Sequence, residues 1–281
     1  MAVPELPEVE TIRRDLDKEV VGRRVKAVEV KGKRSIRRHK SGPEFRGKLE
    51  GRRVASVRRA GKYLLFGLEG EDVLVVHLGM SGQLLRAKSP KDPVDRHTHV
   101  VITFTQGGQL RFVDPRTFGE MFVTSTDQLG SQVPELAHLG FDPTEDVMSW
   151  DRFGKLLAER PAPLKALLMD QKFVAGIGNI YSDEILFAAG LRYDRQSNSL
   201  SAQEIRRLYR SMVETLSEAI KYRGSSLADE QYRDLYGEIG EYQGQHQVYD
   251  REGQACRRCR NSIVRVKVNG RSAFLCEHCQ I

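Results

Sequence analysis

The sequence predicts an α+β protein of several domains, with an N-terminal β-sandwich flanked by helices, a helical domain and a small C-terminal hairpin held by cysteines. Three observations support this prediction. Short runs of alternating apolar and polar residues, separated by Gly, Pro and charged turns, fill the first half of the chain. Apolar residues at helical spacing dominate the second half, and two CxxC pairs lie near the end.

With 281 residues, the chain is long enough for two domains and a small accessory unit. We assign residues 1–125 to the sandwich, 126–148 to a linker, 149–250 to the helical domain and 251–281 to the cysteine hairpin. The linker assignment rests on periodicity that fades into Pro, Gly and acidic residues.

The first predicted helix begins within the motif PELPEVE at residues 4–10. Pro7 suits the first turn of a helix, and Glu8 lies where the helix dipole favours negative charge. Apolar residues continue at helical spacing as Val9, Ile12, Leu16 and Val20. A well-built helix start is one interpretation of the motif. The other is chemical, because a proline at a free chain start is a secondary amine that can attack an aldehyde-like carbon, with Glu5 beside it to move protons.

We predict seven strands in the sandwich, at residues 24–31, 52–59, 62–68, 72–78, 98–105, 109–114 and 120–124. Three turns between them stand out: Gly61-Lys62, HLGMSG at 77–82 and DPRTFG at 114–119. An enzyme that acts on one base must take it out of the DNA stack, and an apolar wedge with an arginine for the orphaned partner base fills the hole. Each turn taken alone is equally consistent with ordinary packing.

The second half predicts helices at residues 150–159, 164–170, 180–189 and 202–221, with Ser201 as the cap of the last one. The turn Gly176-Ile177-Gly178-Asn179 precedes the third of these helices and needs its glycines for backbone freedom. Its amides, at a helix N-terminus, are suited to hold a phosphate oxygen, although ordinary helix hairpins use the same turn.

The cysteine pattern predicts a metal site. Sixteen residues separate two CxxC pairs, which consist of Cys256, Cys259, Cys276 and Cys279. This spacing is typical of a closed, tetrahedral four-thiolate zinc site with a two-stranded hairpin between the pairs, and we favour it over a redox role. We therefore expect one structural Zn²⁺ per chain.

Positive charge is concentrated in two stretches. Residues 22–62 hold sixteen basic and three acidic residues, and residues 251–281 hold seven basic and two acidic ones, while the whole chain is only +7. This distribution favours a surface that binds a polyanion over a merely solvated basic surface. No stretch approaches the ~20 apolar residues of a membrane span, and the N-terminus lacks a secretory signal. We expect a cytoplasmic protein that is a monomer and has no membrane partner.

Five motifs in order resemble those of the formamidopyrimidine-DNA glycosylase (Fpg or MutM) family: PELPEVETIRR, HLGM, DPRTFG, AGIGNIYSDEILF and the terminal zinc finger. The resemblance implies a helix-two-turns-helix element in the helical domain. It implies that Pro4 is the nucleophile and Glu5 moves protons, with Glu8 and Lys62 supporting the site. It also implies DNA-binding roles for Met80, His97, Arg116, Phe118, Lys165, Asn179 and Arg271.

The individual roles also follow from the resemblance. Met80 fills the void, Arg116 faces the widowed cytosine and Phe118 is the wedge. The remaining four contact backbone phosphates. The polar stretch 223–250 has no clear periodicity and is consistent with a lid over the flipped base or with a plain connecting loop.

The implied function is that of a bifunctional DNA glycosylase and AP lyase of base excision repair, in a bacterium and acting on the nucleoid. It flips and excises oxidised purines such as 8-oxoguanine and formamidopyrimidines from double-stranded DNA, forms a Schiff base and cuts the strand at the abasic site by β,δ-elimination. One alternative is an endonuclease VIII-type enzyme for oxidised pyrimidines, which PELPE in place of PEGPE and the DPRTF loop disfavour. The other alternative is a catalytically silent protein that binds damaged DNA.

The silent alternative depends on the three residues that precede the motif. Met1-Ala2-Val3 place Pro4 inside a peptide bond, where its nitrogen is not nucleophilic. Either the true start lies at Val3, where a GUG start codon has been translated as valine, or the extension is real and the proline chemistry is disabled. We favour the first interpretation.

Overall fold

The computed structural model describes residues 3–281 and divides the chain into two compact units. The first unit comprises the chain up to Ala137 together with Arg223–Glu241. The second comprises His138–Tyr222 and Tyr242–Ile281. Each unit buries its own set of apolar side chains.

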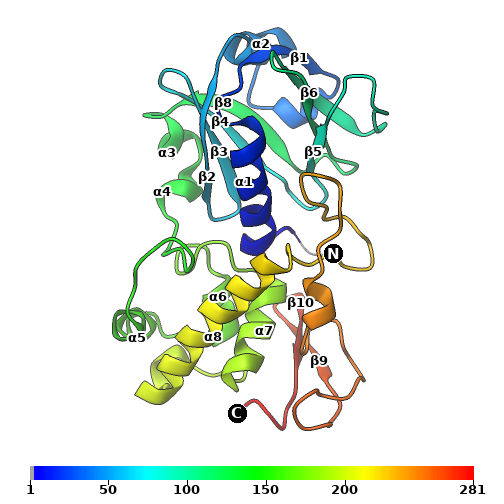
Figure 1. Cartoon of the computed structure of the whole chain (residues 1–281). Coiled ribbons are helices and arrows are strands. Elements are labelled where there is room, and N and C mark those ends of the chain that lie inside the picture. The colour runs from blue at the N-terminus through cyan, green and yellow to red at the C-terminus, as the bar shows by residue number, and fades with distance from the viewer. Residues whose placement is uncertain (1–2) are drawn as a thin grey trace. The chain divides into compact units, whose positions relative to one another are not determined.

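In the residues that the structure describes, the first unit contains eight strands in two antiparallel sheets (Figure 1). One sheet has the order β1 (Val25–Val30), β6 (Thr98–Phe104), β7 (Gln109–Val113), β5 (Gln83–Ala87). The other has the order β2 (Val54–Ala60), β3 (Tyr63–Leu68), β4 (Asp72–His77), β8 (Glu120–Ser125). Side chains of both sheets, such as Phe66 and Phe112, share one core cluster, which confirms the predicted sandwich.

All seven predicted strands form within two residues of their expected ends. The strand that the pattern does not predict is β5. It has five residues, directly after the HLGMSG turn, and only two of them are buried, so its alternation is too short to be seen.

Helix α1 (Leu6–Val20) packs against β2 and β3 (Figure 1). Its four apolar residues at helical spacing are all buried, as predicted. Each contributes roughly 1.5 to 3 kcal/mol by leaving water. Pro7 lies in the first turn, and Glu5 and Glu8 cap the helix reciprocally, so the N-terminal N–H groups have partners.

Short helices complete the first unit. A 3-10 turn, η1 (Lys33–Ile36), precedes α2 (Gly42–Leu49), and α3 (Leu129–Gln132) and α4 (Pro134–Ala137) follow β8. Val133, between α3 and α4, is fully buried against the sheet residues Leu65 and Phe122. The beginning of the predicted linker therefore packs onto the sandwich.

The second unit contains the four predicted helices, α5 (Trp150–Glu159), α6 (Leu164–Met169), α7 (Asn179–Ala189) and α8 (Ala202–Lys221). Ser201 caps α8 in a reciprocal box with Glu204, as its position predicts. Two 3-10 turns, η2 (Ser197–Ser199) and η3 (Tyr242–Gln245), lie between elements, and the predicted hairpin consists of β9 (Val264–Val268) and β10 (Arg271–Leu275). Within residues 3–281, none of the helices is long and apolar enough to cross a membrane.

Residues 223–241 differ from the predicted domain boundaries, because they pack with the sandwich and not with the helical domain at 149–250. Tyr232 and Leu235 belong to the same core cluster as α1. The Arg86 N–H donates to the Leu235 carbonyl at 2.8 Å, which adds this segment to the free edge of β5. The Arg223 guanidinium pairs with the buried carboxylates of Asp15 and Asp234. A few apolar residues in an aperiodic stretch give no sequence pattern from which this docking follows.

A buried ion pair joins α1 to β2. Glu10 Oε2 lies 3.1 Å from Arg59 Nε, and the two side chains are 2% and 1% exposed. Arg13 and Arg14 also bond to Glu10. Burial raises the pKa of Glu10, but the hydrogen bonds and charges of the three arginines outweigh it and lower the pKa below its usual 4.5.

We predict that Glu10→Gln destabilises the protein by ~3 kcal/mol at neutral pH, because it leaves the Arg59 guanidinium buried without its anion. The folded pKa lies below the unfolded one, so the carboxylate stabilises the fold above about pH 4.5 and loses this effect as the pH falls. Urea denaturation should therefore show a gap between wild type and variant that narrows in acid. The exposed Glu214→Gln, which breaks a surface pair with Arg210, is the matched control and should change stability by less than about 0.5 kcal/mol. A gap that stays constant with pH would contradict this assignment.

Candidate nucleic-acid interface and metal centre

The start of α1 brings together three of the predicted catalytic residues. Pro4 and Glu5 directly precede the helix, and both are buried. The Glu5 N–H donates to Glu8 Oε2 at 2.9 Å, and the Glu5 carboxylate accepts from the backbone of Glu8 in return. Two carboxylates are thereby fixed within one turn of the proline, in an arrangement that can move protons at a group bound there.

In the full sequence, the Pro4 nitrogen belongs to the Val3–Pro4 peptide bond. A tertiary amide has no nucleophilic lone pair, so amine chemistry requires a chain that starts at Pro4. Met1 and Ala2 lie outside the described residues, and both interpretations of the start site stay predictions.

Glu8 has a second partner that sequence reasoning missed. Its Oε1 accepts the Ser225 N–H at 2.7 Å, so the segment 223–241 is bonded to the predicted catalytic turn within the same unit. Gly224, with φ +81°, approaches so closely that a Cβ there would lie 2.7 Å from Glu8 Oε1. Glu8 is therefore a junction between the start of α1 and a segment more than two hundred residues away.

Lys62 lies in the tight turn between β2 and β3, after Gly61 with φ +56°, and it is half-buried. The His77 ring, at the end of β4, stacks on Tyr63 with 4.6 Å between ring centroids. Burial lowers the pKa of His77 to about 4, opposed by Glu120 and assisted by the charge of Lys62. His77 is therefore neutral at physiological pH, and its Nδ1 accepts the Gly79 N–H at 3.3 Å, which leaves its proton on Nε2.

Asp114 organises the two turns that the sequence predicts as wedge loops. It is fully buried, and its Oδ1 accepts from the Ser81 hydroxyl at 2.5 Å and from the Arg116 N–H at 3.2 Å. Its Oδ2 accepts from the Gly119 N–H at 2.8 Å. One carboxylate thus joins HLGMSG to DPRTFG. The motif contains Asp114, but nothing in the sequence shows that Ser81 is its partner.

The joined turns hold Met80, Arg116 and Phe118 in one part of the first unit. Phe118 is 44% exposed, which is unusual for so large an apolar side chain, while Met80 is half-buried. The Arg116 guanidinium lies 4.9 Å from the centroid of the Phe118 ring. A Cβ at Gly79 would lie 2.6 Å from the Gly119 nitrogen, so the two turns are in direct backbone contact. An exposed aromatic ring beside an arginine, on a rigid base, is suited to enter a base stack.

His97 lies next to the DPRTFG turn, because its carbonyl accepts the Asp114 N–H at 3.0 Å. The His97 ring is half-buried, and its Nε2 accepts from Arg96 at 3.0 Å. The neighbouring His99 bonds to the Asp114 carbonyl oxygen at 2.8 Å. Of the two histidines, His99 is bonded to the backbone of the DPRTFG turn, while the His97 ring lies beside the Arg96 guanidinium.

In the second unit, the turn before α7 is held from inside. Gly176 has φ +88°, and Asn179 is the first residue of the helix. Gln171, which the sequence does not single out, accepts the Gly176 N–H and donates to the Ile177 carbonyl, both at 2.8 Å. A side-chain amide that replaces two backbone partners fixes the turn and presents the helix N-terminus, as an anion site requires.

Lys165 differs from its predicted role. The residue is 3% exposed, and its ammonium donates to Asp183 Oδ1 at 2.6 Å, Ser182 Oγ at 3.2 Å and the Asn179 carbonyl at 3.3 Å. These interior acceptors account for its three N–H donors. The geometry therefore supports a structural role for Lys165, which braces the phosphate-binding turn from the protein interior. It does not support a direct contact of Lys165 with phosphate.

Asp183 and Glu184, adjacent on α7, hold the C-terminal part of the chain. Asp183 Oδ2 accepts the Phe274 N–H of β10 at 3.0 Å. Glu184 accepts the N–H groups of Gln247, Val248 and Tyr249 at 2.8 to 3.0 Å. Burial raises the pKa of both acids, while Lys165 and the backbone amides lower it again and favour the charged form.

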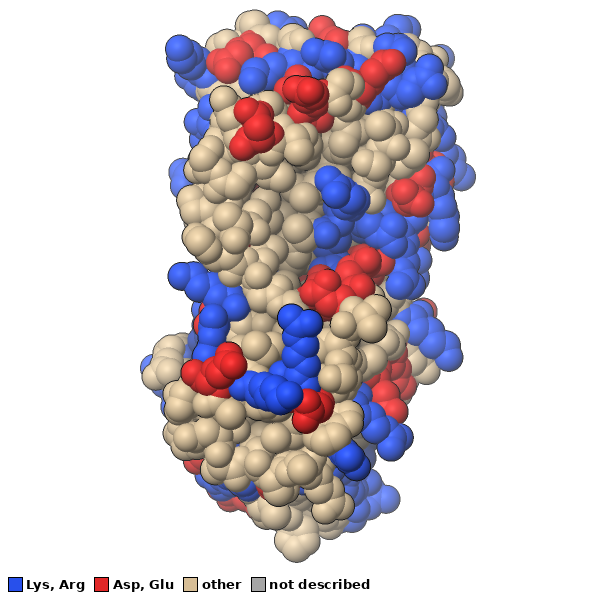
Figure 2. Space-filling view, turned by 90° about the vertical axis from the view of Figure 1, so that its left-hand side faces the viewer, with Lys and Arg blue, Asp and Glu red and all other residues tan. Residues whose placement is uncertain are grey.

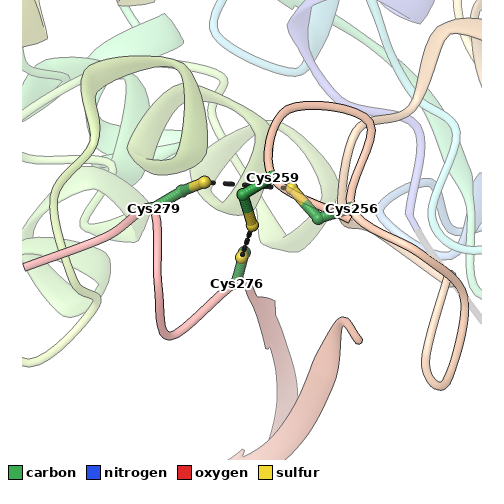
Figure 3. Close-up of side chains that lie close together, drawn as sticks. All are labelled: Cys256, Cys259, Cys276 and Cys279. Atoms are coloured by element: carbon green, nitrogen blue, oxygen red, sulfur yellow. Dashed lines mark hydrogen bonds between the residues drawn. The ribbon is translucent and has the colours of Figure 1, made fainter. Parts of the chain in front are cut away.

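The four cysteines converge as predicted (Figure 3). Their Sγ atoms lie within 4.8 Å of one another, with 3.4 Å between Cys259 and Cys276 and 3.9 Å between Cys256 and Cys279. A tetrahedral zinc with Zn–S bonds of about 2.3 Å requires about 3.8 Å between sulfurs, so these residues fit the ion. No other chemistry is needed to explain four thiols at these distances.

The hairpin that the cysteines anchor carries basic residues. Arg271 begins β10 next to the tip and is exposed. A groove of ≈ 550 Å³ beside it is lined by Arg265, Lys267 and Arg271, with Glu252 as its one acidic residue. Figure 2, a view from another side, shows lysine and arginine side chains spread over both units and interspersed with acidic and uncharged side chains.

Comparisons with known proteins agree with these features. Residues 3–121 match the model of the formamidopyrimidine-DNA glycosylase N-terminal domain, residues 139–231 match its H2TH domain, and residues 253–281 match the zinc finger found in FPG and IleRS. The chain is 39% identical to the formamidopyrimidine-DNA glycosylase of Desulfitobacterium hafniense, over 99% of this chain and 100% of that one.

Two solved structures are similar over nearly the whole chain. MutM (Fpg) from Thermus thermophilus has a TM-score of 0.86 and 40% identity, covering 99% of this chain and 98% of that one. Lactococcus lactis Fpg in complex with DNA that contains an abasic site has a TM-score of 0.88 and 34% identity, covering 98% and 99%. The zinc-finger match and the thiol geometry together show that the four cysteines bind one structural zinc ion.

We predict that Cys276→Ser loses the zinc, because three thiolates do not close the tetrahedral site. Native mass spectrometry should find one zinc per wild-type chain and less in the variant. Amide exchange should speed up in β9 and β10, since metal binding supplies ~10 to 16 kcal/mol to such small units. His278→Ala is the matched control, as His278 is an exposed potential ligand within the second CxxC pair. Zinc lost from the His278 variant, or fully retained by the Cys276 variant, would contradict the four-thiolate assignment.

Proposed function

The chain belongs to the formamidopyrimidine-DNA glycosylase family, and from that premise we propose that it is a bifunctional enzyme that excises oxidised purines from duplex DNA and then cuts the strand. The observation that carries this proposal is the start of α1, where buried Glu5 and Glu8 are fixed within one turn of Pro4. A lyase that forms an iminium needs an amine nucleophile and acid–base groups beside it, and a secondary amine next to two fixed carboxylates provides both.

The reaction begins when the Pro4 amine, freed at the start of the mature chain, attacks C1′ of the flipped nucleotide. The N–C1′ bond forms, the glycosidic bond breaks and the base departs with a proton. With a pKa of ~7.7 to 8.0, roughly a tenth to a sixth of such amines are neutral at pH 7 and able to attack. The amine loses its proton, and the sugar ring then opens: the C1′–O4′ bond breaks, O4′ takes a proton, and an iminium forms between the Pro4 nitrogen and C1′. The iminium acidifies C2′, so loss of a C2′ proton expels the 3′ phosphate and a second elimination expels the 5′ phosphate.

Glu5 is the group that we assign to these proton transfers. It is 2% exposed and is held by the helix cap, so it has a fixed position relative to Pro4. Glu8 orients Glu5 through the reciprocal cap, and Lys62 supplies a cation for the sugar-phosphate. The structural zinc ion stabilises the hairpin and takes no part in these steps.

Flipping a base leaves a hole in the stack, at a cost of a few kcal/mol. We assign Phe118 and Met80 to this hole and Arg116 to the cytosine opposite. Their joint fixation by Asp114 supports the assignment, because a wedge must keep its shape while the DNA bends. His97, Asn179 and Arg271 are assigned to backbone phosphates, where positive charge and N–H donors position the duplex without reading sequence.

Two other functions are consistent with the same residues. An enzyme for oxidised pyrimidines would use the same nucleophile, and the lesion preference rests on the family resemblance. A silent damage-binding protein would keep the wedge and the phosphate contacts but have Pro4 in an amide bond. Product analysis separates all three.

We predict that a chain that starts at Pro4 releases 8-oxoguanine from a duplex that pairs it with cytosine and leaves phosphates on both sides of the gap. Chromatography of the free base and gel electrophoresis of the strand measure the two steps. The chain that retains residues 1–3 is the matched control, since its Pro4 nitrogen is an amide, and it should bind the duplex without cutting it. Activity confined to an oxidised pyrimidine would favour the endonuclease VIII-type alternative. Binding by both chains without any product would favour the silent one.

We predict that Arg116→Ala relaxes the preference for cytosine opposite the lesion. A lost arginine contact to a base costs about 1 to 3 kcal/mol of discrimination, so the rate ratio between cytosine and adenine duplexes should fall roughly 5-fold to 150-fold. Single-turnover kinetics on the two duplexes give this ratio. Arg58→Ala, which removes an exposed arginine from β2, is the control and should leave the ratio unchanged. An unchanged ratio in the Arg116 variant would exclude its assigned contact.

A further inference from the structure

Asp183 bonds to two parts of the second unit that the proposed function assigns to DNA. Through Oδ1 it holds Lys165, whose ammonium also binds the Asn179 carbonyl at the phosphate-binding turn. Through Oδ2 it holds the Phe274 N–H of β10, the strand that begins with Arg271. One buried carboxylate therefore connects the turn to the zinc-finger hairpin.

The connection runs through a buried ion pair between Asp183 and Lys165. Asp183 is 2% exposed and Lys165 is 3% exposed. Removing both charges from water costs several kcal/mol per ion, and an apolar pair of similar volume often stabilises a fold as well or better. What an apolar pair lacks is direction, since it offers no acceptor for the Phe274 N–H and no donor for the Asn179 carbonyl.

The hairpin needs such an external bond. Two short strands are marginal by themselves, and β9 and β10 have five residues each. Zinc holds the two CxxC pairs, which flank the hairpin. Arg271 lies three residues before Phe274, next to the hairpin tip at Asn269-Gly270. The Asp183 bond holds β10 along its length against α7, on which it packs.

We propose that Asp183 is a positioning residue for DNA binding, which sets Arg271 in register with the phosphate-binding turn of Asn179. The inference rests on the proposed phosphate contacts of these two residues. Asp183 itself touches no DNA. The ion pair with Lys165 anchors Asp183 beside the phosphate-binding turn, and the bond to the Phe274 amide transmits this position to Arg271.

The test measures binding to a duplex with a tetrahydrofuran abasic analogue, which the enzyme cannot cleave. Asp183→Asn should weaken binding roughly 10-fold. The plot of log association constant against log salt concentration should become less steep by about 1, as expected when one phosphate contact is lost. Amide exchange of residues 271–275 should accelerate while zinc content stays at one per chain. The control is Asp194→Asn, which removes the same charge from an exposed pair with Arg192 in the same unit and should change none of these quantities.

A double-mutant cycle isolates the route through Arg271. Arg271→Ala should weaken binding by a similar factor, and adding Asp183→Asn to it should cause no further loss. A merely stabilising Asp183 would leave the salt slope unchanged and add its effect to that of Arg271→Ala, and either result would overturn the proposal. Where Asp183→Asn folds poorly, Lys165→Met combined with Asp183→Leu replaces both buried charges by apolar groups. That pair should restore stability and still show the reduced salt slope.

The wild-type chain separates this inference from the proposed function. Wild type that binds and cuts the damaged duplex, with Asp183→Asn unchanged in affinity and slope, overturns the role of Asp183 alone. Wild type that neither binds nor cuts overturns the proposed function and the inference with it.

Discussion

Buried carboxylates that accept backbone N–H groups fix the functional loops of this protein. A carboxylate out of water is costly unless several donors surround it, so each one forces its partners into a single arrangement. Glu8 and Asp114 act in this way in the first unit, and Asp183 and Glu184 do so in the second. Apolar contacts hold parts of these loops in the core but do not fix the direction of their N–H groups, and the four acids supply that directional constraint.

This arrangement suits the proposed chemistry. A wedge that replaces a flipped base has to stay rigid while the duplex unstacks around it, and a proton-transfer group has to keep its place beside the nucleophile. Asp114 bonds the two wedge turns to each other so that they are held together rigidly. The reciprocal cap of α1 fixes the position of Glu5. The zinc ion has the corresponding role for the hairpin, where four thiolates replace a core that so small a piece cannot build.

The fold could be predicted wherever the sequence is periodic. Alternation gave seven strands and helical spacing gave the main helices, because in both cases the buried face repeats along the chain. The short strand β5 was not predicted because two buried residues in five give too short an alternation. The segment 223–241 was not predicted because its burial depends on partners distant in sequence, as Leu235 shows in the sandwich core. The cysteine site was predictable because metal geometry constrains the spacing itself.

The candidate site was predictable as a set of motifs and not as a set of contacts. Lys165 shows the difference, since a lysine in a motif gives no hint that Asp183, on the next helix, occupies its ammonium. Ser225 on Glu8 and Ser81 on Asp114 are likewise ordinary serines in the sequence, one bonding through its backbone and one through its hydroxyl. Side chains that act through a second residue leave no pattern of their own, so such positioning residues require a structure.

In the proposed reaction, the Pro4 nitrogen forms a covalent bond with C1′ of the damaged nucleotide. Borohydride added while the enzyme acts on an 8-oxoguanine duplex reduces an iminium to a stable amine and joins protein to DNA. Peptide mass spectrometry then identifies the linked residue. We expect a peptide that begins at Pro4 and carries the sugar on its terminal nitrogen. A cross-link at Lys62, or cleavage of the duplex without any cross-link, would contradict it.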